Sequence, residues 1–172
     1  MIEPFVPYLV QEGAISYGLS SYGYDLRLAD EWSIPPSPGA MPVLDPKRIG
    51  ASDFARVREP TYELAPGCYV LGRTIEYLRI PPDVLALCTG KSSYARCGVL
   101  VNATPFEPGW EGYVTLCIAN LGQQSVRLLS GEGIAQVLFF LSDERCEMTY
   151  AERKGRYQGQ QGVTPARVPG DR

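Results

Sequence analysis

Short β-forming runs separated by turn residues dominate this chain and limit the folds it can adopt. From residue 68 onward these runs recur at intervals of roughly 8–12 residues, the spacing typical of all-β domains. Gly, Pro or Asn lies between almost every pair, and the chain of 172 residues contains 18 Gly and 15 Pro. We therefore expect strands at residues 68–74, 84–89, 99–103, 113–119, 125–129 and 134–141.

The side-chain pattern within two of these runs predicts how they are buried. In residues 113–119, Val114, Leu116 and Ile118 form an apolar face, and the alternate residues form a mixed face that we expect to look into a pocket. Residues 134–141 are apolar on both faces except for Gln136, which indicates a strand buried on both sides. A distorted β-barrel or jelly roll with short helical turns accounts for such strands, because it closes or covers its sheet edges.

The remaining segments predict turns and loops. Residues 6–12 favour one weak helical turn, and residues 15–28 indicate a loop that leads into a strand. Five prolines between residues 35 and 46 exclude a central strand or helix and predict a surface loop. We treat residues 1–172 as a single domain that ends in a flexible tail or lid, residues 154–172, which is polar and rich in Gly and Gln.

Charge and hydropathy argue against several classes of protein. With 16 basic and 19 acidic residues the net charge is −3, which argues against broad electrostatic binding to nucleic acid. No apolar stretch approaches the roughly 18 residues needed to cross a bilayer, and the first residues lack the basic and apolar segments of a secretory signal. We expect a cytoplasmic protein that binds neither nucleic acid nor membranes.

The chain contains no histidine, which restricts its possible chemistry. Ser-His-Asp and Cys-His catalysis and the histidine-ligated zinc deaminases are excluded. The five cysteines include no Cys-x-x-Cys pair, so the sequence indicates neither a disulfide framework nor a zinc cluster. Catalysis has to rely on carboxylates, hydroxyls, thiols, amides, Lys or Arg.

Three clusters contain residues suited to ligand binding or catalysis. The densest, Gly-Lys-Ser-Ser-Tyr-Ala-Arg at 90 to 96, places two cations and two hydroxyls after a strand, as phosphate binding requires. Its alternative is a turn with solvated Lys and Arg, and a P-loop is excluded because Leu85 stands where the P-loop needs Gly. Residues 104–112 indicate a rigid turn that carries an aromatic ring. Residues 155–162 supply a cation, an aromatic ring and amides to a segment able to close over a ligand.

In this order and spacing the clusters resemble the dCTP deaminase family, which has the dUTPase-like fold. The matching motifs are Ser-Tyr-Gly at 16 to 18, Ser-Tyr-Gly-Tyr-Asp-Leu-Arg at 21 to 27, Gly-Lys-Ser-Ser-Tyr-Ala-Arg-Cys-Gly at 90 to 98, Thr-Pro-Phe-Glu-Pro-Gly-Trp-Glu-Gly at 104 to 112, Gly-Glu-Gly-Ile-Ala-Gln at 131 to 136 and Arg-Tyr-Gln-Gly-Gln at 156 to 160. The resemblance runs from residue 1 to about residue 164.

The resemblance implies a hydrolase acting on a cyclic amidine. It implies a homotrimer with active sites between subunits, which binds dCTP with Mg²⁺ on the triphosphate. It also implies zinc-free conversion of dCTP to dUTP and ammonia, which supplies the precursor of thymidylate in bacteria. The products and relatives of the substrate, dUTP and dTTP, are further expected ligands, with dTTP as an inhibitor.

The resemblance also assigns roles to individual residues. The triphosphate and base contacts fall on Lys91, Ser92, Ser93, Tyr94, Ala95 and Arg96. Of these, Ser92 and Arg96 are implied to hold the catalytic water and polarise the pyrimidine. Thr115 and Leu116 match the strand that lines the base, Gln136 and Tyr150 match nucleotide contacts, and Gln160 matches the C-terminal lid. From the sequence alone, a hydrogen-bonded core amide is the alternative for Gln136.

This sequence departs from the family in two places. The residue that follows Leu116 is the general-base glutamate in the family and is Cys117 here. A thiol has an ordinary pKa of about 8.5 instead of about 4.3 for a glutamate and is inert when buried in apolar surroundings, so it replaces the carboxylate poorly. The family also has a helix-forming segment of about 20 residues before the equivalent of Met1, so we expect either a truncated chain or a misassigned start. Because that helix helps to cover the barrel, its loss is expected to weaken stability and trimer packing.

Three functions follow as hypotheses. The first is an active dCTP deaminase, in which Cys117 is tolerated or Glu107 or Glu111 supplies the base through a water molecule. The second is a protein that binds dCTP or dUTP without turnover. The third and weakest is a pyrophosphatase like the dUTPases, whose water-positioning Asp motif is not evident in this sequence.

Overall fold

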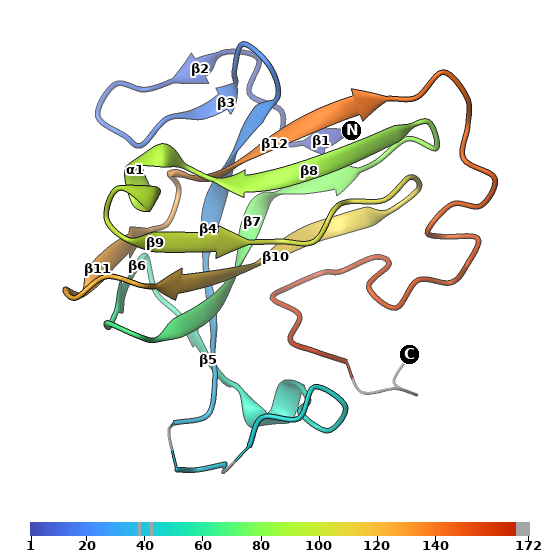
Figure 1. Ribbon diagram of the computed structural model, residues 1–172. Helices are drawn as coiled ribbons and strands as arrows, with labels where there is room; N and C mark the ends of the chain where they lie inside the picture. Colours follow the sequence, from blue (N-terminus) through green and yellow to red (C-terminus); the bar gives the residue numbers. More distant parts are fainter. Residues whose placement is uncertain (38, 42, 168–172) are drawn as a thin grey trace.

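The fold, taken from a computed structural model that describes residues 1–37, 39–41 and 43–167, consists mainly of β-strands (Figure 1). The strands are β1 (Ile2–Glu3), β2 (Leu9–Val10), β3 (Tyr17–Leu19), β4 (Tyr24–Ile34), β5 (Ala55–Arg58), β6 (Thr61–Leu64), β7 (Tyr69–Arg79), β8 (Val84–Gly90), β9 (Val99–Asn102), β10 (Glu111–Asn120), β11 (Val126–Leu129) and β12 (Gly133–Leu141). Two short helical elements accompany them, the 3-10 turn η1 (Ala51–Asp53) and the helix α1 (Ser92–Ala95). The all-β prediction is confirmed.

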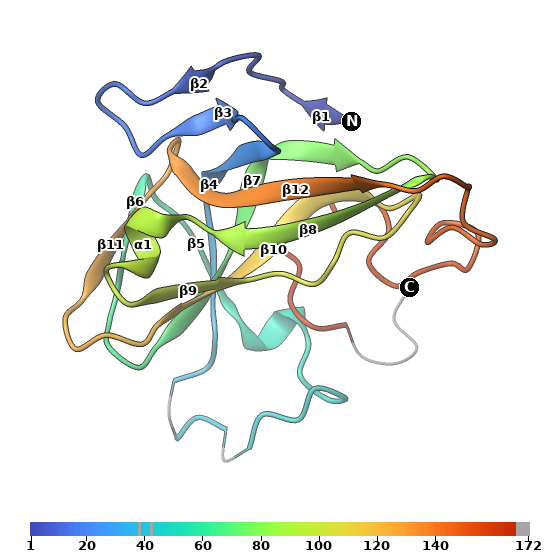
Figure 2. The same cartoon turned by 45° about the horizontal axis from the view of Figure 1, so that its top comes forward.

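The strands form one large curled antiparallel sheet and one small sheet. The large sheet runs in the order β2-β3-β4-β7-β10-β9, and β12 pairs with β4 on one side and β8 on the other. The small sheet pairs β11 with β6. Figure 2 shows β12 and β8 side by side, with α1 at the end of β8 and β9 leading away from it. This arrangement places α1 at one end of β9 and the loop before β10 at the other.

Alternate residues of the long strands form the core. The predicted apolar face of residues 113–119 is confirmed, because Val114, Leu116 and Ile118 are at most 2% exposed. They pack with apolar side chains of the neighbouring strands, among them Leu26, Leu28, Trp32, Val70 and Leu78. The period-two pattern therefore puts the other face of β10 outside the core, where it can contribute to a site.

Burial of β12 on both sides is confirmed only for its first half. Ile134 and Val137 are fully buried, whereas Phe140 is 49% and Leu141 is 77% exposed. Phe140 lies opposite Leu85 of β8, which is also exposed. In the same part of β8, Val84 and Ala86 are buried in the core, so Phe140 and Leu85 lie on the outer face of this strand pair.

Two predictions about the first 46 residues have different outcomes. The helical turn at residues 6–12 is wrong: β2 lies within this range and pairs with β3, and an extended hairpin satisfies backbone groups that a helix interrupted by Pro7 cannot. The proline-rich segment 35–46 contains no named helix or strand among its described residues, as predicted, and Pro38 and Pro42 lie outside them. No helix within residues 1–37, 39–41 and 43–167 has the length and apolar character needed to cross a bilayer.

Candidate active site

The outer face of β10 carries Thr115 and Cys117, two of the predicted site residues. In the sheet register Thr115 lies opposite Arg73 of β7, and Cys117 lies between Leu71 of β7 and Asn102 of β9. Both side chains are partly exposed, whereas Leu116 between them is fully buried in the core. The side chain of Leu116 therefore points away from the site, so a ligand on this face can meet only its backbone.

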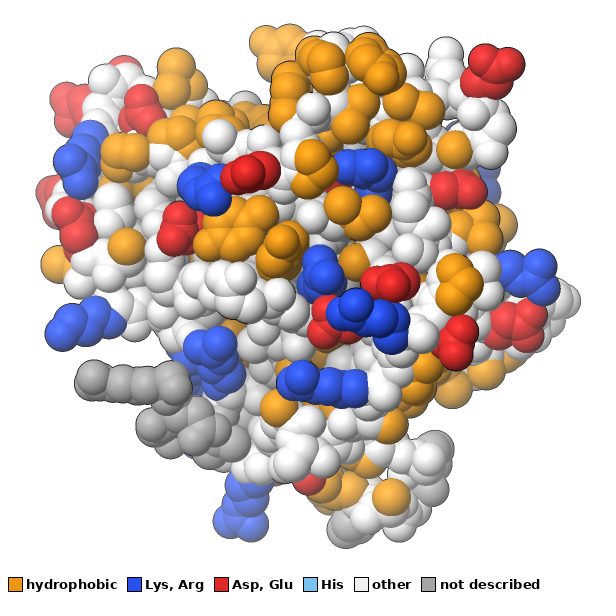
Figure 3. Space-filling view, turned by 180° about the vertical axis from the view of Figure 1, so that it is seen from behind, with side chains coloured by type: hydrophobic (Ala, Val, Ile, Leu, Met, Phe, Trp, Pro, Cys, Tyr) orange, Lys and Arg blue, Asp and Glu red, His pale blue; other side chains and the backbone are white. Residues whose placement is uncertain are grey.

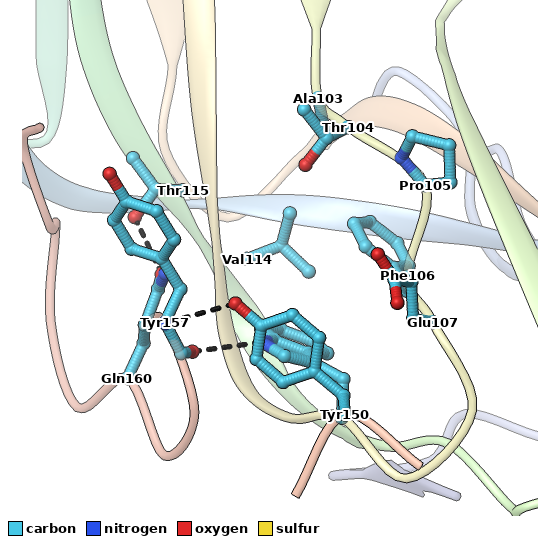
Figure 4. Close-up of a pocket in the computed structure, with 11 residues that line it drawn as sticks. Ala103, Thr104, Pro105, Phe106, Glu107, Val114, Thr115, Tyr150, Tyr157 and Gln160 are labelled. Carbon is cyan, nitrogen blue, oxygen red and sulfur yellow. Dashed lines mark hydrogen bonds between the residues drawn. The ribbon is translucent and has the colours of Figure 1, made fainter. Parts of the chain in front are cut away.

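A cavity of about 320 Å³ opens beside Thr115 (Figure 4). The loop between β9 and β10 supplies one wall, in which the rings of Phe106 and Trp110 stack with centroids 5.4 Å apart. Tyr157 and Gln160 lie on the opposite side, and Tyr150 lies between the two sides. Aromatic rings with a few polar groups suit a flat, polar heterocycle. Of the predicted site residues, Thr115, Tyr150 and Gln160 line this cavity.

The described part of the tail, residues 154–167, folds back along β10. The Tyr113 N–H donates to the Gln160 carbonyl oxygen at 2.9 Å, and Gly112 pairs with Gln160 in a parallel bridge. Gly112 has φ +151° and a Cβ there would lie 2.9 Å from the Gln160 nitrogen, so the close approach of the tail requires glycine. The tail therefore covers one side of the cavity, and its opening as a lid stays a prediction.

Thr115 is held by the tail through two hydrogen bonds. Its hydroxyl donates to Gln160 Oε1 at 3.0 Å and accepts the Thr164 N–H at 3.0 Å. Further along, the Trp110 indole N–H donates to the Tyr157 carbonyl oxygen at 2.8 Å, and the Tyr157 N–H donates to the Tyr150 hydroxyl at 3.0 Å. A ligand that needs the Thr115 hydroxyl has to displace one of these two partners.

Lys91 lies at the start of α1 and is held inside the chain. Its ammonium donates to Asp25 Oδ2 at 2.5 Å and to Ser16 Oγ at 2.8 Å, and the Lys91 and Asp25 side chains are 12% and 4% exposed. The other oxygen of Asp25 is buried and has no hydrogen-bond partner among the described residues. The ion pair fixes α1 to β4, a role that sequence reasoning did not assign to Lys91.

The rest of the α1 segment presents its polar groups on the surface. Ser92, Ser93, Ala95 and Arg96 are exposed, and Arg96 Nη1 donates to the Ser92 carbonyl oxygen at 3.1 Å. Arg96 forms no salt bridge with any carboxylate in the described ranges, so its charge is available to an anion. Tyr94 differs, because its ring is buried and its hydroxyl accepts the Leu129 N–H at 3.1 Å.

Gln136 belongs with the α1 segment and not with the cavity. It lies in β12 opposite Asp25 of β4 and Thr89 of β8, and its amide donates to Ser20 Oγ at 3.2 Å. Neither Gln136 nor any residue of 91–96 lines the cavity. The structure therefore divides the predicted residues of one chain into an α1 group and a β10 group.

Cys117 is a weak candidate for a base. Burial raises the pKa of its thiol, so the thiol stays protonated at neutral pH. Glu107 is the carboxylate that lines the cavity, and it pairs with Arg153. Within the described residues no three His, Cys, Asp or Glu side chains come together as a metal site.

Sequence reasoning did not place Phe106, Trp110 or Tyr157 in the site, although the structure does. Each belongs to one of the motifs at 104–112 and 156–160. The only sequence signal for these three aromatic residues was that each lies in a motif together with polar residues suited to ligand binding. Their contact across the cavity depends on the path of the tail, which the local sequence does not specify.

Comparison with known proteins gives close relatives over nearly the whole chain. A family model described as dCTP deaminase-like matches residues 1–142. The dCTP deaminase of Acidobacterium capsulatum is 52% identical over 163 residues, covering 95% of this chain and 88% of that protein. The dCTP deaminase of Herpetosiphon aurantiacus is 52% identical over 168 residues, covering 98% and 91%.

Comparison with solved structures supports the dUTPase-like fold. The crystal structure of 2'-deoxycytidine 5'-triphosphate deaminase from Agrobacterium tumefaciens matches with a TM-score of 0.56 and 21% identity, covering 77% of this chain and 41% of that chain. The native EIAV dUTPase matches with a TM-score of 0.50 and 17% identity, covering 86% and 94%. The predicted dUTPase-like fold is confirmed.

Proposed function

This chain belongs to the dCTP deaminase-like family, and we propose that it binds dCTP and hydrolyses the 4-amino group to give dUTP and ammonia. The observation that carries the proposal is the division of the predicted residues into two groups. The cavity beside Thr115 is lined by aromatic rings, the Gln160 amide and the Glu107 carboxylate but by no described Lys or Arg, which suits a base more than a triphosphate. The exposed hydroxyls and guanidinium of the α1 segment suit contacts to the triphosphate and to the reacting edge of the base.

We propose that the two groups meet between copies of the chain in a homotrimer. A nucleoside triphosphate needs both a base pocket and a cationic phosphate site, and one chain presents them apart. In a closed ring of copies, the α1 segment of one copy lies against the β10 face of the next. Mg²⁺ enters with the triphosphate, with phosphate oxygens among its ligands.

In the proposed reaction a water oxygen attacks C4 of cytosine while Ser92 orients that water and Arg96 stabilises the charge that develops on the ring. A base takes one water proton and returns it to the departing amine, and the second water proton ends on N3 of the ring. The C4–O bond forms, the C4–N bond breaks, and ammonia leaves. Thr115 and Gln160 hold the base edge once the tail contact has rearranged.

A second candidate function, binding of dCTP without turnover, is favoured by Cys117. A thiol whose pKa is raised by burial does not take a proton from water at neutral pH. Glu107 is the alternative base for the deaminase, because it lines the same cavity as Thr115.

The test is to incubate the natural chain and the Cys117→Glu variant with dCTP and Mg²⁺ and to measure ammonia and dUTP. We expect the variant to be faster by at least about 10²-fold, the usual contribution of a positioned general base. Cys68→Glu, which changes an exposed cysteine outside the site, is the matched control and should leave the rate unchanged.

Other outcomes separate the candidates. Equal rates for the natural chain and Cys117→Glu mean that residue 117 is not the missing base. Binding of dCTP by calorimetry without ammonia release from the natural chain selects the binding function. Release of pyrophosphate in place of ammonia identifies a dUTPase-like pyrophosphatase.

A further inference from the structure

A second hollow, of about 310 Å³, lies where the end of the tail meets η1 and β5. Ala51, Arg56 and residues 163–167 line it, so the β5 strand and the tail each contribute one arginine. Figure 3 shows the face opposite to that of Figure 1, where several Lys and Arg side chains lie over the lower part of the molecule. None of the residues of this hollow belongs to the cavity beside Thr115.

The two arginines of the hollow have no carboxylate partner among residues 1–37, 39–41 and 43–167. Neither Arg56 nor Arg167 forms a salt bridge within the described ranges, whereas the nearby Arg58 lies 3.9 Å from Glu31. Arg167 Nη1 donates to the Arg156 carbonyl oxygen at 2.5 Å, and its guanidinium lies 5.8 Å from the centre of the Tyr157 ring. These contacts orient Arg167 without neutralising its charge.

The strand beneath the tail contains a polar group without a partner. Ser33 of β4 lies opposite Arg56 in the sheet register and is fully buried, and its hydroxyl has no hydrogen-bond partner among the described residues. Two residues earlier on the same face, Glu31 accepts the Val163 N–H at 3.3 Å and pairs with Arg73 at 2.7 Å. The Glu31 carboxylate is therefore already bound to other groups.

We propose that this hollow binds a phosphate-bearing anion between Arg56 and Arg167. The guanidinium fork matches the spacing of phosphate oxygens, and an anion bound by both arginines that line the hollow offsets the repulsion between their like charges. An anion held by both arginines joins the tail to β5. Because Thr164 also bonds Thr115, an occupied hollow keeps the tail closed over the first cavity. Binding of an anion in this hollow does not require that the chain deaminates dCTP.

The test is calorimetric titration with inorganic pyrophosphate. We expect saturable binding by the natural chain, with affinity lowered at least about tenfold in Arg56→Ala and in Arg167→Ala. Arg127→Ala removes the same charge from an exposed strand arginine on β11 and should leave the affinity unchanged. Thermal unfolding of each variant checks that it remains folded.

Three results overturn the proposal: no binding by the natural chain at millimolar pyrophosphate, equal binding by Arg56→Ala, or loss of binding in Arg96→Ala alone. The last result places the anion at the α1 segment. ATP is titrated as a second probe. Equal affinity for pyrophosphate and ATP means that the hollow recognises the phosphate groups alone. If ATP binds more tightly and Arg56→Ala abolishes this tighter binding, the hollow recognises the phosphates of a nucleotide.

Hydrogen exchange gives a readout on the tail that does not rely on affinity. With saturating pyrophosphate the Thr164 amide, which bonds Thr115, should exchange at least about tenfold more slowly in the natural chain. The same addition should not change exchange in Arg56→Ala. Unchanged exchange in the natural chain contradicts the closing of the tail by the anion.

Discussion

Replacement of Asp25 by Asn removes the charge that holds Lys91, and with it the anchor of α1. The Lys91 ammonium lies 2.5 Å from Asp25 Oδ2, and the two side chains are 12% and 4% exposed, so water compensates little for the lost partner. Removing one partner of a buried ion pair costs about 3–5 kcal/mol of unfolding free energy. Ser16 still accepts a hydrogen bond from the ammonium, so we expect about 3 kcal/mol.

For a chain of this length a loss of about 3 kcal/mol lowers Tm by roughly 6–12 °C. The measurement is thermal unfolding of the natural chain and Asp25→Asn at neutral pH and one fixed protein concentration, because assembly shifts the apparent stability. Glu63→Gln is the control, since Glu63 pairs with Arg127 at 2.9 Å but both side chains are more than 60% exposed. We expect a change below about 1 kcal/mol in the control. Similar small changes in both variants would refute the anchoring role of the buried pair.

Further predictions concern cysteine reactivity and pH. Burial raises the pKa of Cys88 from 9.0 to about 12, so at pH 8 its thiolate fraction should be about 10³-fold lower than that of a cysteine with the ordinary pKa. Mass spectrometry should therefore find iodoacetamide on exposed Cys68 long before it is found on Cys88. Equal labelling of the two cysteines in the folded chain would contradict the burial of Cys88. Burial raises the pKa of Glu31, but Arg73, the Val163 N–H and Arg58 together lower it more, so its folded pKa lies below the ordinary 4.5. The stabilising contribution of Glu31 is present above pH 4.5 and is lost as the pH falls through its pKa in the folded chain. Urea unfolding should therefore show that the free energy of unfolding of the natural chain exceeds that of Glu31→Gln by less and less below about pH 4.5. An advantage that stays constant down to pH 3 would count against the ion pair.

The sequence predicts the faces of β10 because they depend on a local period of two. Val114 and Ile118 face the core and Thr115 and Cys117 face outward, as alternation requires. The outer end of β12 was not predictable in this way. Hydropathy indicates that Phe140 avoids water, but it does not say whether the chain's own core or another surface covers it.

Lys91 shows a second limit of local sequence patterns. Its place in a cluster of cations and hydroxyls indicates a phosphate contact, but its ammonium is bound to Asp25, which lies 66 residues earlier in the chain. Long-range pairings of this kind depend on the sheet topology. The same topology separates the α1 segment from the cavity beside Thr115, which no spacing of motifs reveals.

In the proposed homotrimer, the α1 segment of one copy and the β10 face of another form a single dCTP site. Subunit mixing can show whether such shared sites exist: the natural chain, which has Arg96 but lacks the glutamate at position 117, is co-expressed with the double variant Arg96→Ala, Cys117→Glu. Only sites that take Arg96 from one chain and the new carboxylate from the other are complete.

Ammonia release from dCTP by the mixed assemblies is compared with that of each chain alone and of Cys117→Glu. If sites form between copies, random mixing completes about a quarter of them, so the mixture should reach about a quarter of the Cys117→Glu rate. A mixture no faster than the average of its two components would contradict the account.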